Sequence, residues 1–295
     1  MTVFCLGEVL VDCAGSSCFP GGAPANVAYH VAVLGQGAEI VSRVGNDAAG
    51  RDLTKWLESH SVGTRFLQID PTQATGSVNV LPGPRYKIAA PVAWDFIEPT
   101  DAASVAVTDA GAVVFGTLAQ RQPVSRQTIR ALVETARASG VPILCDLNLR
   151  APFFDEETIM WSLRHCDVLK LNREELDIVS GILGAAGARA DLFAGLLREF
   201  GIARGVLTEG EEGALISEDG RLSRHAAEVV TDITDAVGAG DAFTAVLALA
   251  LARRVPLCKA AASASALSAY VVSKPGATPP VPSRLAARIN AMLGV

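Results

Sequence analysis

Charged residues are scarce in this chain of 295 residues: only 19% are Asp, Glu, Lys or Arg, and the formal net charge is -6. Basic residues form no run longer than the pair Arg253 and Arg254. A nucleic-acid interface needs clustered Lys and Arg against the phosphate backbone, so we expect no nucleic-acid partner. Any anion must be held by a few side chains and backbone amides.

Two common nucleotide-binding motifs are also missing. No GxxxxGK[ST] segment occurs, which excludes a Walker loop. Gly35 and Gly37 lack the third glycine of a dinucleotide fingerprint, and they follow a predicted helix where that fingerprint would follow a strand. A bound nucleotide would need a different phosphate site.

The six cysteines lack paired CxxC spacing, and several lie in apolar runs, so we predict buried, reduced thiols and no zinc site. The four histidines show no metal-ligand spacing either, and we expect structural or surface roles for them. The most apolar stretch, residues 242–252, is well short of the roughly 20 residues that a membrane span needs. With no signal-like start, the chain is expected to be cytoplasmic and to have no membrane partner.

Half of the residues are hydrophobic, enough to bury a large core. Short runs rich in Val, Ile and Leu alternate with helix-like segments, which is typical of a mostly parallel sheet covered by helices. We predict strands at 3–11, 39–44, 112–116, 142–147, 168–171, 205–208 and 214–217. We predict helices at 24–34, 49–60, 125–139, 174–180, 190–200, 239–253, 259–272 and 284–293.

Residues 74–98 break this alternation, because they combine Thr, Val and Tyr with a Pro-Gly-Pro segment and have no helical period. We predict a hairpin that leaves the core. A second extended segment, about residues 10–20, could pair with it as a small lid or a dimerising clasp. The chain 1–295 is otherwise expected to be one domain, without repeats or linkers.

The most informative segment is 235–243, where a turn of small residues runs directly into an apolar helix. The amides of Gly238, Ala239 and Gly240 can point into one concavity at the helix N-terminus, where the helix dipole favours negative charge. Asp241 in the first turn could accept a proton from a sugar hydroxyl. The alternative is an ordinary helix start that Asp241 caps.

A second pair of glycines, Gly21 and Gly22, also precedes a helix start and would let the backbone approach a ligand closely. Asn26 offers both a donor and an acceptor. Asp12, after the first strand, could grip a pair of sugar hydroxyls. Each feature alone is a weak signal, because Gly-Gly is usually a turn and an Asp at a strand end is usually a cap.

Together, GAGDAF at 238–243 and GGAPANVA at 21–28 resemble the two signatures of the ribokinase (PfkB) family of carbohydrate kinases, and the second is similar to its fructokinase form. Their order and separation fit the family as well. Similar segments at 44–50, 146–150, 172–175, 208–213 and 275–277 extend the resemblance over nearly the whole chain.

The resemblance implies a three-layer αβα sandwich with a β lid, with ATP lying across the C-terminal strand ends and the sugar under the lid. It implies that Asp241 is the catalytic base and that Gly238, Ala239 and Gly240 form the anion hole. It implies a sugar site that comprises Asp12, Gly21, Gly22 and Asn26. We add Arg150 to this site, because it could clamp a phosphate; the alternative is that Arg150 joins a structural network.

For the nucleotide, the resemblance implies a turn that lines ATP and contains Thr208, Gly210 and Gly213. It also implies that Asn172 and Glu175 hold a water-bound Mg²⁺ beside the phosphates, which suits an ion that keeps its waters. The alternative for Glu175 is a solvated residue at a helix start. Glu209 puts a charge into the ATP turn, where an apolar or basic residue is more usual in the family.

The resemblance also raises the question of a monovalent cation. Asp235 matches the acid that leads the family's cation loop, but Ala236 follows it in place of the usual Thr. Pro280 stands where some relatives offer a hydroxyl. These two departures predict that activity depends only weakly on K⁺.

We expect Mg-ATP-dependent phosphorylation of fructose or a similar ketose at a primary hydroxyl. Other small acceptors, such as 2-keto-3-deoxygluconate, ribose or a nucleoside, are the alternatives within the enzyme class. A catalytically silent sugar or nucleotide sensor is the alternative outside it, although the intact Asp241 argues against a sensor. A homodimer through the lid is the expected assembly. Aromatic and basic residues near the hairpin are candidate lid contacts or core residues: Tyr86, Lys87, Trp94 and Phe96.

Overall fold

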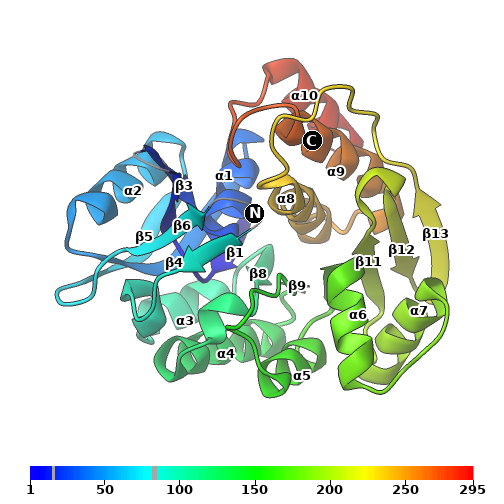
Figure 1. Ribbon diagram of the computed structural model, residues 1–295, viewed down its shortest axis with the longest axis horizontal. Coiled ribbons are helices and arrows are strands. Elements are labelled where there is room, and N and C mark those ends of the chain that lie inside the picture. Colours follow the sequence, from blue (N-terminus) through cyan, green and yellow to red (C-terminus); the bar gives the residue numbers. More distant parts are fainter. Residues whose placement is uncertain (15–16, 82–84, 295) are drawn as a thin grey trace.

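The computed structural model describes residues 1–14, 17–81 and 85–294. Its centre is a nine-stranded sheet in the order β13-β12-β11-β10-β9-β8-β1-β4-β5 (Figure 1). In this order, each strand from β11 to β5 pairs in parallel with its neighbour. β12 and β13 pair antiparallel at the β11 edge of the sheet. The bounds are β1 (Thr2–Leu6), β4 (Gly37–Gly45), β5 (Gly63–Asp70), β8 (Ala112–Phe115), β9 (Ile143–Asp146), β10 (Val168–Asn172), β11 (Arg204–Thr208), β12 (Ala214–Glu218) and β13 (Arg221–His225).

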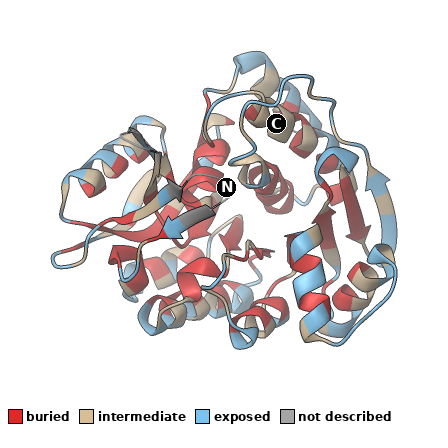
Figure 2. Ribbon diagram, in the orientation of Figure 1, coloured by how far each residue is buried: buried red, intermediate tan, exposed pale blue. Residues whose placement is uncertain are grey.

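Helices cover both faces of this sheet. Val3 and Cys5 of β1 pack into one core and Phe4 and Leu6 into the other, as the two-residue period of a strand requires. The first core is closed by α1 (Ala23–Val33), α2 (Ala48–Ser59), α8 (Ala239–Ala252), α9 (Leu257–Val272) and α10 (Ser283–Met292). The second is closed by α3 (Asp101–Val107), α4 (Pro123–Ala138), α5 (Glu156–Arg164), α6 (Arg173–Ile182) and α7 (Arg189–Phe200). The predicted three-layer αβα fold is confirmed, with the buried residues lining the sheet on both sides (Figure 2).

A smaller sheet has the strand order β3-β2-β6-β7. Its strands are β2 (Leu10–Ala14), β3 (Ser17–Gly21), β6 (Gly76–Leu81) and β7 (Arg85–Ile88). β2 pairs in parallel with β6, so the two extended segments singled out in the sequence do join. The Pro-Gly-Pro segment expected to turn the hairpin, residues 82–84, lies outside the described residues. Trp94 is completely buried and belongs to the core, which settles its role in favour of packing.

The single strand predicted at 3–11 is wrong. The chain leaves the large sheet after Leu6 and enters the small one at Leu10. Gly7 makes this change of direction possible, because its φ of 141° is one that other residues rarely adopt. Asp12, which was expected after the first strand of the large sheet, therefore lies in β2 of the small sheet.

Two strands, β5 and β13, and two α-helices, α3 and α5, were not predicted from the sequence. β5 and β13 are the two edge strands of the large sheet, so neither has the continuous apolar run of a strand buried between neighbours. α3 and α5 span 7 and 9 residues, which leaves little room for a helical period to show.

The expectation for the cysteines needs a correction. Cys13 and Cys18 form a disulfide, because the β2–β3 register places them directly opposite each other. Cys5, Cys145 and Cys166 are buried free thiols, as predicted, and Cys258 is free and partly exposed. His30 is buried, with Nε2 2.9 Å from the carbonyl oxygen of Ala277, which agrees with a structural role.

The apolar run at 242–252 forms most of α8, and every residue of that run is buried against the sheet and its neighbouring helices. Within the described residues, no helix combines the length and apolarity needed to cross a membrane.

Candidate active site

The two signature segments meet at the N-termini of α1 and α8. Asn26 Nδ2 donates a hydrogen bond of 2.8 Å to Asp241 Oδ2, although the two residues are 215 positions apart. Gly238, with φ of 79°, is the N-cap of α8, and no side chain caps this helix end. Asp241 is thus bound to α1 and does not cap its own helix.

Asn26 has one further property that bears on a ligand. The side chain is buried, and its Oδ1 has no hydrogen-bond partner among the described residues. Because a buried polar atom without a partner is costly, this oxygen is suited to accept a hydrogen bond from a bound molecule.

Asp12 and the glycine pair lie on the β2–β3 side of the same site. A Cβ atom at Gly21 would overlap Asp12 Oδ2, and one at Gly22 would overlap the carbonyl oxygen of Glu8. Gly22 also has φ of 100°. Gly22 therefore requires glycine, whereas a Cβ atom at Gly21 would mainly displace the end of the Asp12 side chain.

Three carboxyl groups gather at this site. Burial, reinforced by the charge of Asp146, raises the pKa of Asp241 to about 6. Burial and the charge of Asp241 raise the pKa of Asp12 to about 6 and that of Glu8 to about 7. The guanidinium of Arg150 opposes all three shifts, so the predicted Arg150 does belong to this cluster.

Glu8 was missed by the sequence analysis. It is a buried residue, 4% exposed, at the point where the chain passes from the large sheet to the small one. The available signal was a charged residue inside an otherwise apolar segment, which the strand prediction for 3–11 passed over.

The residues predicted for the nucleotide lie at the C-terminal ends of β10 and β11. Asn172 and Thr208 are paired in the sheet register. Glu175 accepts hydrogen bonds from the backbone N–H of Leu149 (2.9 Å) and Asn172 (2.8 Å), and it is only 4% exposed. The alternative of a solvated Glu175 is therefore wrong.

The turn between β11 and β12 contains Gly210 and Gly213, with φ of 61° and 94°. Glu209 in this turn faces inward. Its carboxylate pairs with Arg224 and lies 3.5 Å from Arg189 Nη1 and 3.8 Å from Arg173 Nε. The unusual charge is thus surrounded by arginines from three other elements.

Asp235 connects two loops beside the N-terminus of α8. Its Oδ1 accepts a hydrogen bond from Val237 N (3.0 Å), and its Oδ2 accepts one from Gly276 N (3.2 Å). Among the described residues, no group of three or more His, Cys, Asp or Glu side chains could hold a metal ion.

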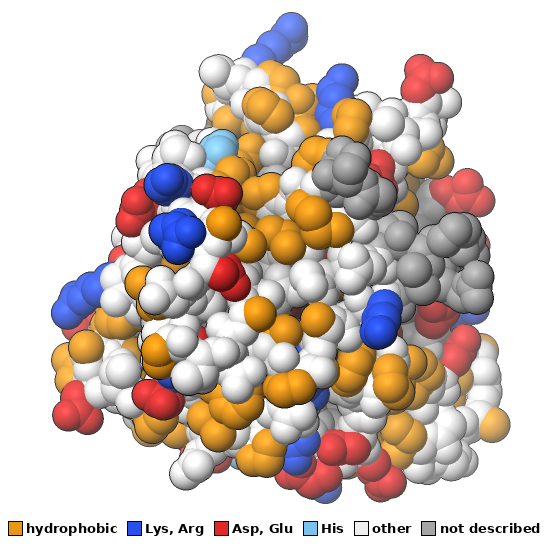
Figure 3. All heavy atoms as spheres, turned by 60° about the vertical axis from the view of Figure 1, so that its left-hand side comes forward, with side chains coloured by type: hydrophobic (Ala, Val, Ile, Leu, Met, Phe, Trp, Pro, Cys, Tyr) orange, Lys and Arg blue, Asp and Glu red, His pale blue; other side chains and the backbone are white. Residues whose placement is uncertain are grey.

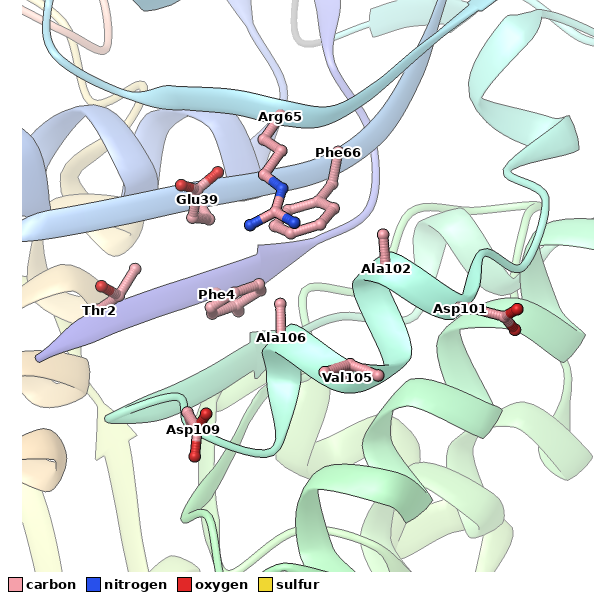
Figure 4. A pocket seen from close by; sticks show the side chains of 10 residues that line it. All are labelled: Thr2, Phe4, Glu39, Arg65, Phe66, Asp101, Ala102, Val105, Ala106 and Asp109. Atoms are coloured by element: carbon pink, nitrogen blue, oxygen red, sulfur yellow. The ribbon is translucent and has the colours of Figure 1, made fainter.

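Other surface features lie apart from this site. On the face shown in Figure 3, Lys and Arg side chains are scattered among acidic and apolar ones and form no basic patch. A groove of about 660 Å³ is floored by Phe4 and Phe66, with Arg65, Glu39 and the helix α3 at its sides (Figure 4). None of the residues lining this groove belongs to the candidate active site.

The comparisons with known proteins agree with this geometry. The model of the pfkB family carbohydrate kinases matches residues 3–284. This chain belongs to that family. As a pfkB carbohydrate kinase, it is a phosphotransferase that acts on sugar hydroxyls.

Individual family members are similar over most of their length. A fructokinase of Klebsiella pneumoniae is 31% identical over 273 residues, which cover 85% of this chain and 84% of that protein. A fructokinase of Vibrio cholerae, solved with fructose, ADP and potassium ion, has a TM-score of 0.83 and 25% identity, covering 99% and 98% of the two chains. Aminoimidazole riboside kinase of Salmonella enterica, complexed with aminoimidazole riboside and an ATP analogue, has a TM-score of 0.83 and 25% identity, covering 99% and 100%.

Proposed function

We propose that this pfkB kinase is a fructokinase that transfers the γ-phosphoryl group of ATP to a primary hydroxyl of fructose, with Asp241 as the base. The observation that carries the proposal is the 2.8 Å hydrogen bond between Asn26 and Asp241. It joins the segment expected to hold the sugar to the segment expected to hold the phosphoryl group.

In the proposed reaction, the ionised Asp241 accepts the proton of the attacking hydroxyl. A new bond forms between that oxygen and the γ-phosphorus, while the bond from phosphorus to the β-γ bridging oxygen breaks and its electrons leave with ADP. The amides of Gly238, Ala239 and Gly240 would stabilise the phosphoryl oxygens at the α8 N-terminus. A weak base suffices, because positioning and charge neutralisation dominate this chemistry.

Asp12 and the unpartnered Oδ1 of Asn26 would bind sugar hydroxyls, with Gly21 and Gly22 allowing the backbone to approach the ring. Thr208, Gly210 and Gly213 would line the nucleotide. Asn172 and Glu175 would hold Mg²⁺ through waters, and the ion would neutralise charge on the phosphates.

The charge of the site supports a neutral acceptor. Arg150 opposes the charges of Glu8, Asp12 and Asp241, and Lys170, which also acts on Asp241, is already paired with Asp146. An acidic acceptor such as 2-keto-3-deoxygluconate would bring a further negative charge and would need a committed Arg or Lys. Fructose, ribose and nucleosides meet no such penalty, and the similarity to fructokinases favours fructose. The similarity to aminoimidazole riboside kinase keeps a nucleoside as the second candidate.

A panel of acceptors tests this proposal. ATP consumption is measured with fructose, ribose, 2-keto-3-deoxygluconate and aminoimidazole riboside, and kcat/KM values are compared, because a site that hydrogen-bonds particular hydroxyls rejects analogues strongly. Fructose should give the highest value. A tenfold or greater preference for another acceptor would overturn the substrate, and sugar binding without turnover would indicate the sensor.

We further propose that the small sheet is a lid over the sugar within a single domain of residues 1–295, and that two lids form a homodimer. Phe19 on the edge strand β3 is 58% exposed and would be covered in such a dimer. Size-exclusion chromatography with light scattering tests this assembly: the native chain should run as a dimer and Phe19→Ser should shift it toward the monomer.

A further inference from the structure

A buried ion pair lies beneath the N-terminus of α8. Lys170 Nζ donates hydrogen bonds to Asp146 Oδ1 (2.9 Å) and Oδ2 (2.7 Å), and each side chain is 8% exposed. The two residues are neighbours in the register of β9 and β10. Neither Lys170 nor its pairing with Asp146 emerged from the sequence analysis.

This pair contacts the turn that carries the proposed anion hole. Thr244 Oγ1 donates a hydrogen bond of 2.6 Å to Asp146 Oδ2 and lies 2.9 Å from the carbonyl oxygen of Gly240. A Cβ atom at Gly240 would lie 3.2 Å from Lys170 Nζ. The ammonium group therefore lies next to Gly240, the residue that precedes Asp241.

Stability alone explains such a pair poorly. Removing two charges from water is costly, and buried ion pairs replaced by well-packed apolar residues are often no less stable. Both members of this pair lie close to the same turn. Their fixed charges act there on the carboxyl group of Asp241, the proposed base.

We propose that Asp146 and Lys170 are positioning residues that hold the Gly238–Asp241 turn in place and set the charge environment of the base. This rests on the proposed function, in which Asp241 is the base. The two charges act in opposite directions, because Asp146 disfavours the ionised form of Asp241 and Lys170 favours it.

Other charged groups also face Asp241. Arg150 favours its ionised form, and the carboxyl groups of Glu8 and Asp12 interact with it across the site. On α1, the uncharged Asn26 donates its hydrogen bond. These groups are left unchanged in the variants below, so differences among the variants report on Asp146 and Lys170.

The test compares Asp146→Asn with the double variant Asp146→Asn/Lys170→Met. In Asp146→Asn the negative charge of Asp146 is removed while Lys170 keeps its acidic neighbour Glu175, so the pKa of Asp241 should fall. The fall in kcat at acidic pH, the acidic limb of the profile, should then move to lower pH by roughly 0.5 unit or more. In the double variant both charges are gone, so the limb should return toward the native position. In both variants kcat should fall by about tenfold, because the turn loses part of its support.

A control exists in the ion pair of Arg121 and Asp95, with Nε to Oδ1 of 2.7 Å, whose side chains are 3% and 0% exposed. It is not among the main charges that set the pKa of Asp241. Asp95→Asn should lower the melting temperature without moving the pH limb. The positioning role is wrong if Asp146→Asn behaves like this control. It is also wrong if kcat falls at the same acidic pH in Asp146→Asn and in the double variant.

A second readout separates this inference from the proposed function. The carboxyl ¹³C shift of Asp241, assigned by its loss in Asp241→Asn, gives the pKa without any turnover. If the native protein phosphorylates no acceptor but the carboxyl pKa moves as expected, only the proposed function fails. If turnover is normal and the pKa does not differ between the two Asp146 variants, only this inference fails.

Discussion

At the scale of single residues, Asp241 is held between opposing influences. Burial and the charge of Asp146 raise its pKa to about 6, while the hydrogen bond from Asn26 and the charges of Lys170 and Arg150 lower it. The result is a carboxyl group that is mostly ionised at neutral pH but is a stronger base than an exposed aspartate. Such a value suits a group that must accept a proton near pH 7.

This pKa predicts a pH dependence. Because the ionised form is the active base, kcat should be constant above about pH 7 and should fall as the pH drops through about 6. Asn26→Ala removes a hydrogen bond to the ionised form, so its limb should move to higher pH. The measurement is kcat at saturating sugar and ATP from pH 4.5 to 8.5. A limb near pH 4 in the native protein would contradict the account.

Asp12 leads to a prediction about binding. Asp12→Ala removes a charged acceptor for sugar hydroxyls, an interaction of roughly 1.5 to 3 kcal/mol, so sugar affinity should fall about ten- to a hundredfold while ATP affinity changes little. Calorimetry with each ligand measures both. An equal loss for sugar and ATP would show that Asp12 serves the fold of the site and not the sugar.

Residue patterns reveal some of these groups more readily than others. Asp12, Asn26, Asp241 and Arg150 stand in recognisable segments, and the structure brings them together as the sequence predicts. Lys170 and Glu8 lie in apolar strand-like runs, and only the three-dimensional arrangement shows that their charges meet the site. The sequence shows that a charged residue lies within an apolar run, but it does not show which residue that charge will meet in the folded protein.

At the scale of elements, the site depends on two helix starts that face each other. The glycine at each start has a positive φ, 100° at Gly22 and 79° at Gly238. The elements found from sequence are those with a continuous apolar run or a clear helical period, such as α8. The edge strands β5 and β13 have partly solvated faces, and their pairing depends on distant parts of the chain, which a local pattern does not encode.

Gly238→Ala tests the helix start of α8. A Cβ atom there would lie 2.5 Å from Ala277 Cα, in addition to the unfavourable φ. We expect kcat to fall by on the order of 10² or more, the size found when an oxyanion-hole contact is lost. Gly220→Ala is the matched control, because Gly220 has φ of 77° and open space around it. If both variants lose activity equally, backbone strain alone explains the effect.

The loop at Asp235 leads to a prediction about monovalent cations. Ala236 and Pro280 lack the hydroxyl groups that the family resemblance would place near the ion, and both oxygens of Asp235 already accept backbone N–H groups. Replacing K⁺ by a bulky organic cation should therefore change kcat only a few-fold. A collapse of activity in this assay would mean that the loop binds K⁺ through Asp235 and backbone carbonyls.

At the scale of the whole molecule, the large sheet carries Asn172 and Thr208 at the ends of β10 and β11, and the small sheet carries Asp12 and Gly21. The mostly parallel sheet covered by helices was predicted from alternating apolar and helical segments, and the αβα sandwich from the family resemblance. The pairing of β2 with β6 matches the two extended segments expected to join. The Cys13–Cys18 disulfide was not predicted from the sequence, because it depends on the β2–β3 register.

The most direct test of the account is transfer of the γ-phosphoryl label from ATP to fructose by the native protein and by Asp241→Asn. The native protein should produce labelled fructose phosphate. The Asn variant should bind fructose and ATP with nearly native affinity, while its kcat falls by on the order of 10² or more, the size of a general-base contribution. Absence of labelled fructose from the native protein, or near-normal turnover by the Asn variant, would contradict it.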